Sequence, residues 1–194
     1  MKNIFAVLFA AALISAAAHA GERTLFGGRV EHGGFGGPYV KFTQVNGQFG
    51  LLVGGRGAWV INHVFAIGGG GCGLANNVDS GRPDSLLSFG YGGGILEWII
   101  RSDEVLHFTA ETLIGGGGIG LFQEDQANSG NRDHHSDGVF VLEGAANLEL
   151  NVATWFRVAA GVGYRMVSGV EIAGLENSDF SGPAATLMLK FGKF

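Results

Sequence analysis

The stretch NLELNVATWFRVAAGVGYRM, residues 147–166, decides the fold of this chain. In its first half Asn147 and Glu149 alternate with leucines. In its second half Arg157 and Arg165 are an even number of residues apart and so share one face of a strand, while apolar residues such as Val158 and Val162 fall on the other face. Alternation with a period of two is the pattern of a β-strand that has one polar and one apolar face. The stretch therefore predicts two adjacent antiparallel strands, joined by the tight connection 151–154.

The same alternation recurs along the chain and predicts eight strands in all. They span about 38–46, 48–61, 64–75, 85–100, 105–122, 138–150, 155–167 and 183–194. Tight connections at 62–63, 102–104 and 151–154 alternate with longer polar connections at 76–84, 123–137 and 168–182, and only the short hairpin at 46–47 departs from this pattern. An even number of strands with alternating short and long connections is typical of an up-and-down transmembrane β-barrel. We expect an all-β, eight-stranded antiparallel barrel of this kind.

Charge density indicates which face of the strands lies inside. A water-facing exterior carries about 25–35% charged residues, whereas the polar face here has only one or two ionic groups per strand. The apolar face is continuous and carries Trp59, Trp98 and Phe156 toward strand ends, as an interfacial aromatic girdle would. We therefore predict that the apolar face contacts lipid and that the polar face lines the lumen.

The ionic residues assigned to the lumen separate by sign. The basic members are Lys41, Arg56, Arg157, Arg165 and Lys190, and the acidic members are Glu97, Glu111, Glu143 and Glu149. The bases fall on strands one, two, seven and eight, which are contiguous in a closed barrel, and the acids fall on strands four to six. Side chains fill the interior of an eight-stranded barrel, and buried ions need partners. We predict a salt-bridge network that closes the lumen; a gated polar path is the alternative.

The chain begins with a leader. Residues 1–20 have one lysine, an apolar run and the ending Ala18-His19-Ala20, which predicts a secretory signal peptide cleaved before Gly21. A retained anchor is the alternative, although the run is short for a membrane span. We assign residues 21–37 to a glycine-rich lead, which is either a short periplasmic segment or a loose plug. Residues 38–194 are assigned to the barrel.

Charge and cysteine content exclude two classes of protein. Removal of residues 1–20 takes away one lysine and no acid, so the net charge changes from −5 to −6, which disfavours a nucleic-acid partner. The single cysteine, Cys72, excludes an internal disulfide framework and is expected to be a small packing residue.

Four features of the sequence carry a resemblance to a known class of proteins: the signal peptide, the eight alternating strands, the stretch LELNVATWFRVAAGVGYR and the terminal ATLMLKFGKF. In these features the sequence resembles the small outer-membrane β-barrels of the OmpA/OmpX type, and more closely the outer membrane β-barrel protein families of Gram-negative bacteria. The resemblance implies a location in the bacterial outer membrane, contact with outer-membrane lipid or lipopolysaccharide, and insertion by the barrel-assembly machinery. A monomer is expected.

The resemblance also implies a terminal aromatic residue that the assembly machinery reads, and Phe194 matches it. The alternate apolar positions that such a signal requires are occupied by Gly192 and Lys190, while Leu187, Leu189 and Phe191 lie one residue out of phase. Either Phe191 is the effective assembly residue or the last residues form a bulge.

Three motifs suggest further chemistry, and each has a simpler explanation. The runs GGGGCG and GGGGIG lie within strands, so we do not expect them to bind phosphate. His134 and His135 in NRDHHSDG are weak candidates for a metal site, and solvation of a loop is the expected role. His107 and Glu111 share a face and could form a base–orienter pair, but no nucleophile accompanies them, so a lumen contact is expected. No cofactor is predicted.

Several functions remain compatible with the sequence. The first is a structural or interaction barrel that acts through its outer loops and is not an enzyme. The alternatives are a narrow channel for small solutes, a lipid-modifying barrel enzyme, and a secreted calycin-like barrel whose apolar face lies inside and binds a hydrophobic ligand.

Overall fold

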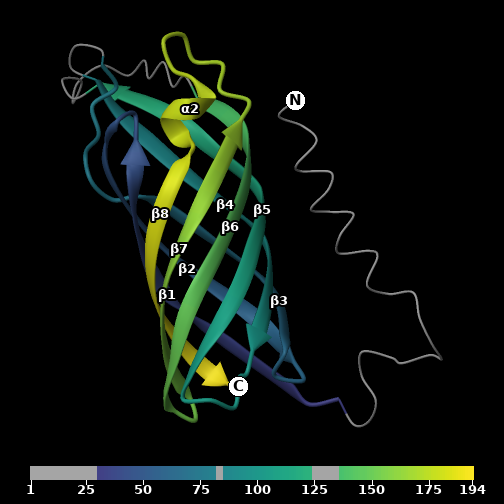
Figure 1. Ribbon diagram of the computed structural model, residues 1–194. Helices are drawn as coiled ribbons and strands as arrows, with labels where there is room; N and C mark the ends of the chain where they lie inside the picture. The colour runs from purple at the N-terminus through teal and green to yellow at the C-terminus, as the bar shows by residue number, and fades with distance from the viewer. Residues whose placement is uncertain (1–29, 82–84, 124–135) are drawn as a thin grey trace, which may run out of the picture. The chain divides into compact units, whose positions relative to one another are not determined.

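The computed structural model describes residues 30–81, 85–123 and 136–194. Eight strands follow one another in the sequence and in space: β1 (His32–Val45), β2 (Gln48–Ile61), β3 (Phe65–Leu74), β4 (Ser85–Ile100), β5 (Leu106–Gln123), β6 (Ser136–Ala153), β7 (Phe156–Ser168) and β8 (Gly182–Lys193). Each pairs antiparallel with the next, and β8 pairs with β1, which closes the barrel (Figure 1). The predicted eight-stranded up-and-down barrel is confirmed.

The two ends of the barrel differ. Tight turns join β2 to β3, β4 to β5 and β6 to β7 at the end where β1 begins and β8 ends, which we call the inner end. The opposite, outer end carries the longer connections and the short helix α2 (Asn177–Phe180) (Figure 1). The β1–β2 turn at that end is Asn46-Gly47, with φ of 51° and 69°, the left-handed pair that a type I′ hairpin requires.

The first strand is longer than predicted. It begins at His32, six residues before the expected start at 38, so residues 32–37 belong to the barrel wall and not to a lead. The alternation of polar and apolar residues could not be recognised in this segment, because glycine has no side chain that would distinguish the two faces of a strand. They pair with the inner half of β2, from Arg56 to Ile61, whose other edge pairs with β3. The predicted signal peptide and residues 21–29 lie outside the described residues.

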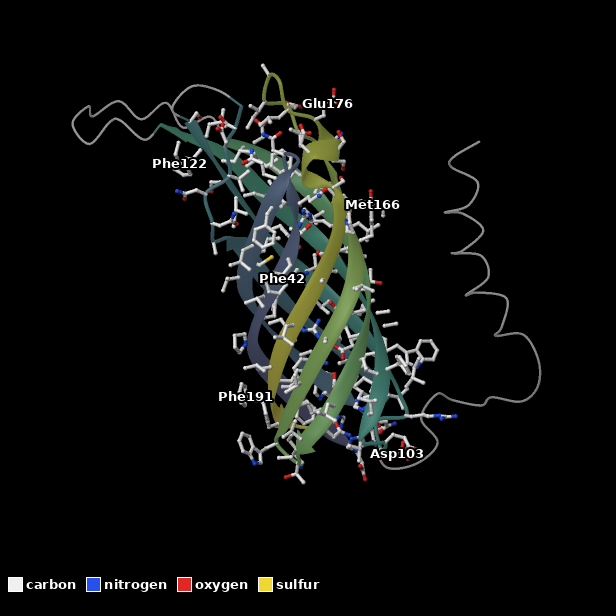
Figure 2. The ribbon with its side chains drawn as sticks, turned by 60° about the vertical axis from the view of Figure 1, so that its left-hand side comes forward. Phe42, Asp103, Phe122, Met166, Glu176 and Phe191 are labelled. Carbon is white, nitrogen blue, oxygen red and sulfur yellow. The ribbon has the colours of Figure 1, made fainter. Side chains whose placement is uncertain are left out.

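Large apolar side chains cover the outside of the barrel. Phe42, Phe122, Met166 and Phe191 are between 42% and 49% exposed (Figure 2), and Val162 is 67% exposed. The calycin-like alternative, which needs this face inside, is therefore wrong. Among the described residues, no helix is long and apolar enough to cross a membrane.

The interior has two layers. At the outer end, the inside of the barrel is filled by apolar side chains, which we call the outer apolar layer. They are Val45, Leu52, Val78, Leu87, Phe89, Ile119, Val139, Val141, Val167, Ile172, Leu175 and Phe180. The rest of the lumen, toward the inner end, contains the charged side chains together with buried apolar ones such as Phe35, Val60 and Met188. The charge inside the barrel was predicted from the alternation, whereas the apolar layer was not.

Glycine forms part of the wall across β2–β5. Gly55, Gly71, Gly92 and Gly116 are direct neighbours from strand to strand, on the outward face. On the inward face, Gly93 and Gly115 oppose each other so closely that a Cβ on Gly115 would lie 2.1 Å from the carbonyl oxygen of Gly92 and 2.5 Å from the Cα of Gly93. These strands can approach in this way only without side chains.

We predict that Gly115→Ala lowers the free energy of unfolding by about 1–3 kcal/mol, because the added methyl group collides with backbone that cannot move aside. Gly144→Ala is the matched control, since a Cβ there meets nothing within 4 Å. Urea unfolding of the barrel folded in detergent measures both. Equal midpoints for the two variants would contradict the close approach of β4 and β5.

Candidate functional site: the charged lumen

The barrel strands direct the ionic residues inward by their alternation. Lys41, Glu97, Glu143, Glu149, Arg157, Arg165 and Lys190 are at most 7% exposed. The side chains of Arg56 and Glu111 are 6% and 11% exposed. All nine residues assigned to the lumen from the sequence therefore lie inside the barrel.

Six of these residues form one connected series, which we call the ionic chain. It runs Glu111, Arg56, Glu97, Lys190, Glu149, Arg157. Glu97 accepts from Arg56 at 2.9 Å and from Lys190 at 2.5 Å, and Lys190 also contacts Glu149 at 2.5 Å. Arg157 donates to Glu149 at 3.1 Å, and Arg56 pairs with Glu111. The ionic chain joins six strands across the lumen.

A separate pair lies nearer the outer end. Lys41 pairs with Glu143, and the Tyr91 hydroxyl donates to the second oxygen of Glu143 at 2.5 Å. The Lys41 ammonium also lies 5.2 Å from the centre of the Tyr39 ring. Tyr91 was not singled out from the sequence, although it is in phase with Glu97 on β4 and so had to point inward.

Arg165 departs from the predicted network. It lies directly across from Glu143 in the β6–β7 register, yet it forms no ion pair with any carboxylate of the described residues. Its Nε donates to the carbonyl oxygen of Phe180 at 2.7 Å, and its guanidinium lies 5.0 Å from the centre of the Phe89 ring. Glu143 is already occupied by Lys41 and Tyr91, which explains why Arg165 turns to the outer connection.

His107 does not pair with Glu111. Its Nε2 lies 3.5 Å from Glu149, and its Nδ1 lies 3.3 Å from the carbonyl oxygen of Glu104. Glu111 is held by Arg56 and by the Asn147 amide, which donates at 3.2 Å. The suggested base–orienter pair is thus wrong, and His107 is a neighbour of the ionic chain.

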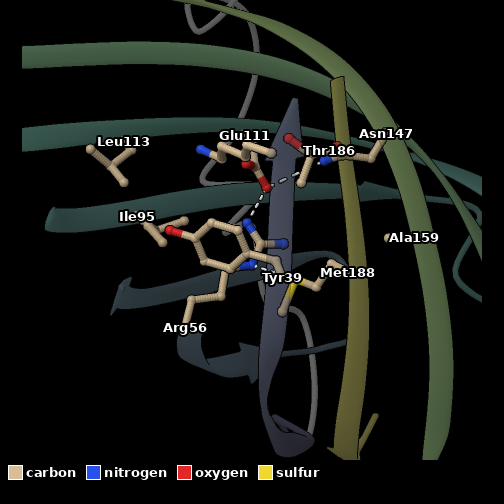
Figure 3. A pocket seen from close by; sticks show the side chains of 10 residues that line it. Tyr39, Arg56, Ile95, Glu111, Leu113, Asn147, Ala159, Thr186 and Met188 are labelled. Carbon is tan, nitrogen blue, oxygen red and sulfur yellow. Dashed lines mark hydrogen bonds and ion pairs between the residues drawn. The ribbon is translucent and has the colours of Figure 1, made fainter. Parts of the chain in front are cut away.

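A small cavity lies beside the ionic chain in the lumen. Figure 3 shows the cavity between Tyr39, Arg56, Glu111, Asn147 and Met188, where the Arg56 guanidinium points at Glu111. Its volume is about 10 Å³, which is room for about one water molecule. The ionic chain and the Lys41–Glu143 pair together hold four cations and four carboxylates, so this part of the interior is balanced in formal charge.

The two terminal aromatic residues occupy opposite faces. Phe191 points outward and stacks with Phe156 at 5.0 Å, within an aromatic group that includes Trp155. Phe194 turns inward, where its ring lies 3.9 Å from the Arg157 guanidinium and 5.9 Å from the Phe35 ring. The β1–β8 pairing keeps one register as far as Lys193, so of the two alternatives for the last residues the bulge is not formed.

The remaining candidates lie elsewhere. His134 and His135 are outside the described residues. Within the described ranges, no group of three His, Cys, Asp or Glu side chains could hold a metal ion. Cys72 is a buried free cysteine on the inward face of β3.

No protein-family model matches the sequence, and no curated protein matches it. Solved structures do share the fold. Neisserial surface protein A aligns over 86% of this chain and 100% of its own, with a TM-score of 0.60 and 10% identity. The N-terminal β-barrel domain of Pseudomonas aeruginosa OprF aligns over 83% and 96%, with a TM-score of 0.55 and 11% identity.

The attachment invasion locus protein Ail of Yersinia pestis aligns over 83% of this chain and 95% of its own, with a TM-score of 0.47 and 16% identity. Neisserial surface protein A and the OprF domain, which have the higher TM-scores, are small eight-stranded outer-membrane β-barrels. This chain has the fold of that class. Because the sequence identities are so low, the similarity concerns the fold alone.

We predict that Lys190→Met lowers the free energy of unfolding by about 3–5 kcal/mol, because it leaves Glu97 and Glu149 buried with one fewer cation between them. The double variant Lys190→Met/Glu97→Gln should recover part of this loss, since it leaves two balanced ion pairs, Arg56 with Glu111 and Arg157 with Glu149. Glu171→Gln, on the exposed outer connection, is the control. Urea unfolding measures all three, and a double variant that is less stable than Lys190→Met would contradict the charge-balance explanation.

Proposed function

We propose that this protein is a bacterial outer-membrane barrel with a sealed lumen, which anchors its outer connections at the cell surface for a structural or interaction role. The observation that carries the proposal is the ionic chain, which crosses the lumen and leaves a cavity of only about 10 Å³ beside it. A pathway for solutes would require these paired charges to separate in a buried setting, at a large energetic cost.

Membrane insertion is supported by the outer surface. Large exposed apolar side chains surround the barrel, and monomeric soluble proteins rarely expose such continuous apolar area. Trp59, Trp98 and Trp155 are each at least 50% exposed and lie close to inner-end turns, where interfacial aromatic residues are expected in such barrels. Lipid is thus the first proposed partner.

The outer connections are hydrogen-bonded to one another, which supports a role in presenting them together at the surface. The backbone N–H of Asn46 donates to the carbonyl oxygen of Asp179 at 2.7 Å, and its side chain donates to the carbonyl oxygen of Asp79 at 2.9 Å. The β1–β2 turn therefore links the β3–β4 and β7–β8 connections. Contact of this end with lipopolysaccharide or another surface partner is part of the proposal.

We also propose which residue the assembly machinery reads and that the barrel is not an enzyme. Phe191 faces outward with Leu187 and Leu189, so we assign it, and not the inward-facing Phe194, as the aromatic residue read by the barrel-assembly machinery. We propose a monomer with no enzymatic activity, because the buried carboxylates are committed to ion pairs.

Val162→Arg separates a membrane barrel from a water-soluble one. Val162 is at the middle of β7 and is 67% exposed. In a bilayer, arginine at a lipid-facing midplane position is expected to cost about 2–4 kcal/mol, whereas arginine on a water-facing surface is nearly neutral. Unfolding titrations in lipid vesicles measure the difference, with Ser178→Arg on the outer surface as the control. A neutral result for Val162→Arg would contradict insertion.

Fractionation and conductance test the sealed barrel. We expect the protein in the outer-membrane fraction, with a mobility on a denaturing gel that shifts only after boiling. In a planar bilayer the folded protein should show no steps of conductance, because the lumen is filled by side chains. Permeability that depends on solute size would favour the narrow channel instead.

A further inference from the structure

The β7–β8 connection, residues 169–181, folds back into the outer end of the barrel, and we call it the cap. Three of its apolar side chains are buried: Ile172 is 2% exposed, Leu175 is 9% exposed and Phe180 is fully buried. The Phe180 ring packs against the Phe89 ring of β4 at 5.2 Å. The cap thus completes the outer apolar layer from above (Figure 1).

Arg165 holds the cap from inside the lumen. Its Nε donates to the carbonyl oxygen of Phe180 at 2.7 Å, and its Nη2 makes only long contacts, of 3.4 Å to the carbonyl oxygen of Gln44 and 3.5 Å to Thr43. Its Nη1 is buried and has no partner among the described residues. A fully buried cation is therefore bound by neutral groups, although a carboxylate lies on the neighbouring strand.

Glu143 is that carboxylate. It is the direct cross-strand neighbour of Arg165, on the same inward face, and side chains in such positions can reach one another. Lys41 and Tyr91 occupy its two oxygens in the closed arrangement. Each contact uses one acceptor site, and an ionised carboxylate offers about four. A second arrangement is therefore available to Arg165, in which it leaves Phe180 and joins Glu143 beside Lys41 and Tyr91.

The cap is joined to the strands in a way that permits separate movement. Gly169, directly after β7, has φ of +97°, and Gly174, within the cap, has φ of +83°, a region that glycine enters without strain. Outside the cap, α2 contacts mainly β7 and β1. The inter-strand ladders of β7 and β8 do not include residues 169–181, so lifting the cap breaks no ladder hydrogen bond. It breaks three bonds from backbone N–H groups: Asn46 to Asp179, Val167 to the Ser181 hydroxyl and Glu171 to the Asp137 carboxylate.

We propose that residues 169–181 form a separable cap over the outer mouth of the lumen, that Arg165 is its latch, and that Arg165 exchanges the Phe180 carbonyl for Glu143 when the cap lifts. Lifting exposes the apolar wall formed by Phe89 and its neighbours but leaves the ionic chain intact. The inference is independent of the proposed function, because it concerns the folded barrel in any amphiphilic surroundings.

Hydrogen exchange of the full chain, folded in detergent micelles and followed by mass spectrometry, tests the proposal. In the wild type, peptides from the cap and the amide of Asn46, which donates to Asp179, should exchange at least tenfold faster than the strands, because local opening needs less free energy than global unfolding. If the cap exchanges only together with the strands, it is not separable and the proposal fails.

Arg165→Gln should speed exchange of the cap by about 10- to 100-fold, which corresponds to the loss of a hydrogen bond from a charged donor, and should leave the strands unchanged. Arg157→Gln is the matched control, because it changes an arginine of the same strand at the inner end. Unchanged cap exchange in a folded Arg165→Gln barrel would overturn the role of the latch.

The partner exchange has its own test. In the double variant Lys41→Met/Glu143→Gln, the alternative partner of Arg165 is removed together with the lysine that it balances. We expect slower exchange of the cap than in the wild type, because the open arrangement loses its ion pair. Equal or faster exchange would overturn the exchange of partners while leaving the latch itself supported.

Discussion

The structure depends on the burial of charge in balanced pairs. Four cations and four carboxylates occupy a space that side chains fill almost completely, and each ion is stable there only because an opposite charge lies within contact distance. Since the partners come from different strands, the ionic chain also fixes how the strands face one another across the lumen. The apolar outer surface follows from the same alternation, because each residue between two inward positions must face outward.

This arrangement gives the two layers of the interior different roles. The ionic layer joins strands that are distant in sequence, such as β2 with β5 and β4 with β8. The apolar layer at the outer end joins the wall to the connections, through residues such as Phe180 and Val78. Arg165 lies at the border between the layers, which accounts for its unusual partners. Lys41 and Tyr91 already contact Glu143, and the outer connection offers the carbonyl oxygen of Phe180.

Sequence alone could predict much of this fold, because alternate residues of a strand face opposite sides of the sheet, so one inward residue fixes the direction of all the others. Glu149 and Arg157 were correctly placed inside on that basis, and β2 and β4 have the predicted bounds. Parity also carried the information that Tyr91 and Phe194 point inward, since they are in phase with Glu97 and Lys190. The start of β1 could not be predicted, because glycine leaves no polar or apolar signature. The partner of Arg165 could not be predicted either, because it belongs to a connection whose fold depends on packing over the finished barrel.

The glycine neighbours on the outward face of β2–β5 have a consequence for the lipid. Where Gly55, Gly71, Gly92 and Gly116 follow one another around the wall, a bilayer around the barrel would meet peptide groups directly instead of leucine or phenylalanine. Along this row the outer surface is recessed relative to rows that carry side chains. A surrounding ring of lipid would therefore not be uniform, and hydrocarbon would pack closest to the axis where the protein offers only its main chain.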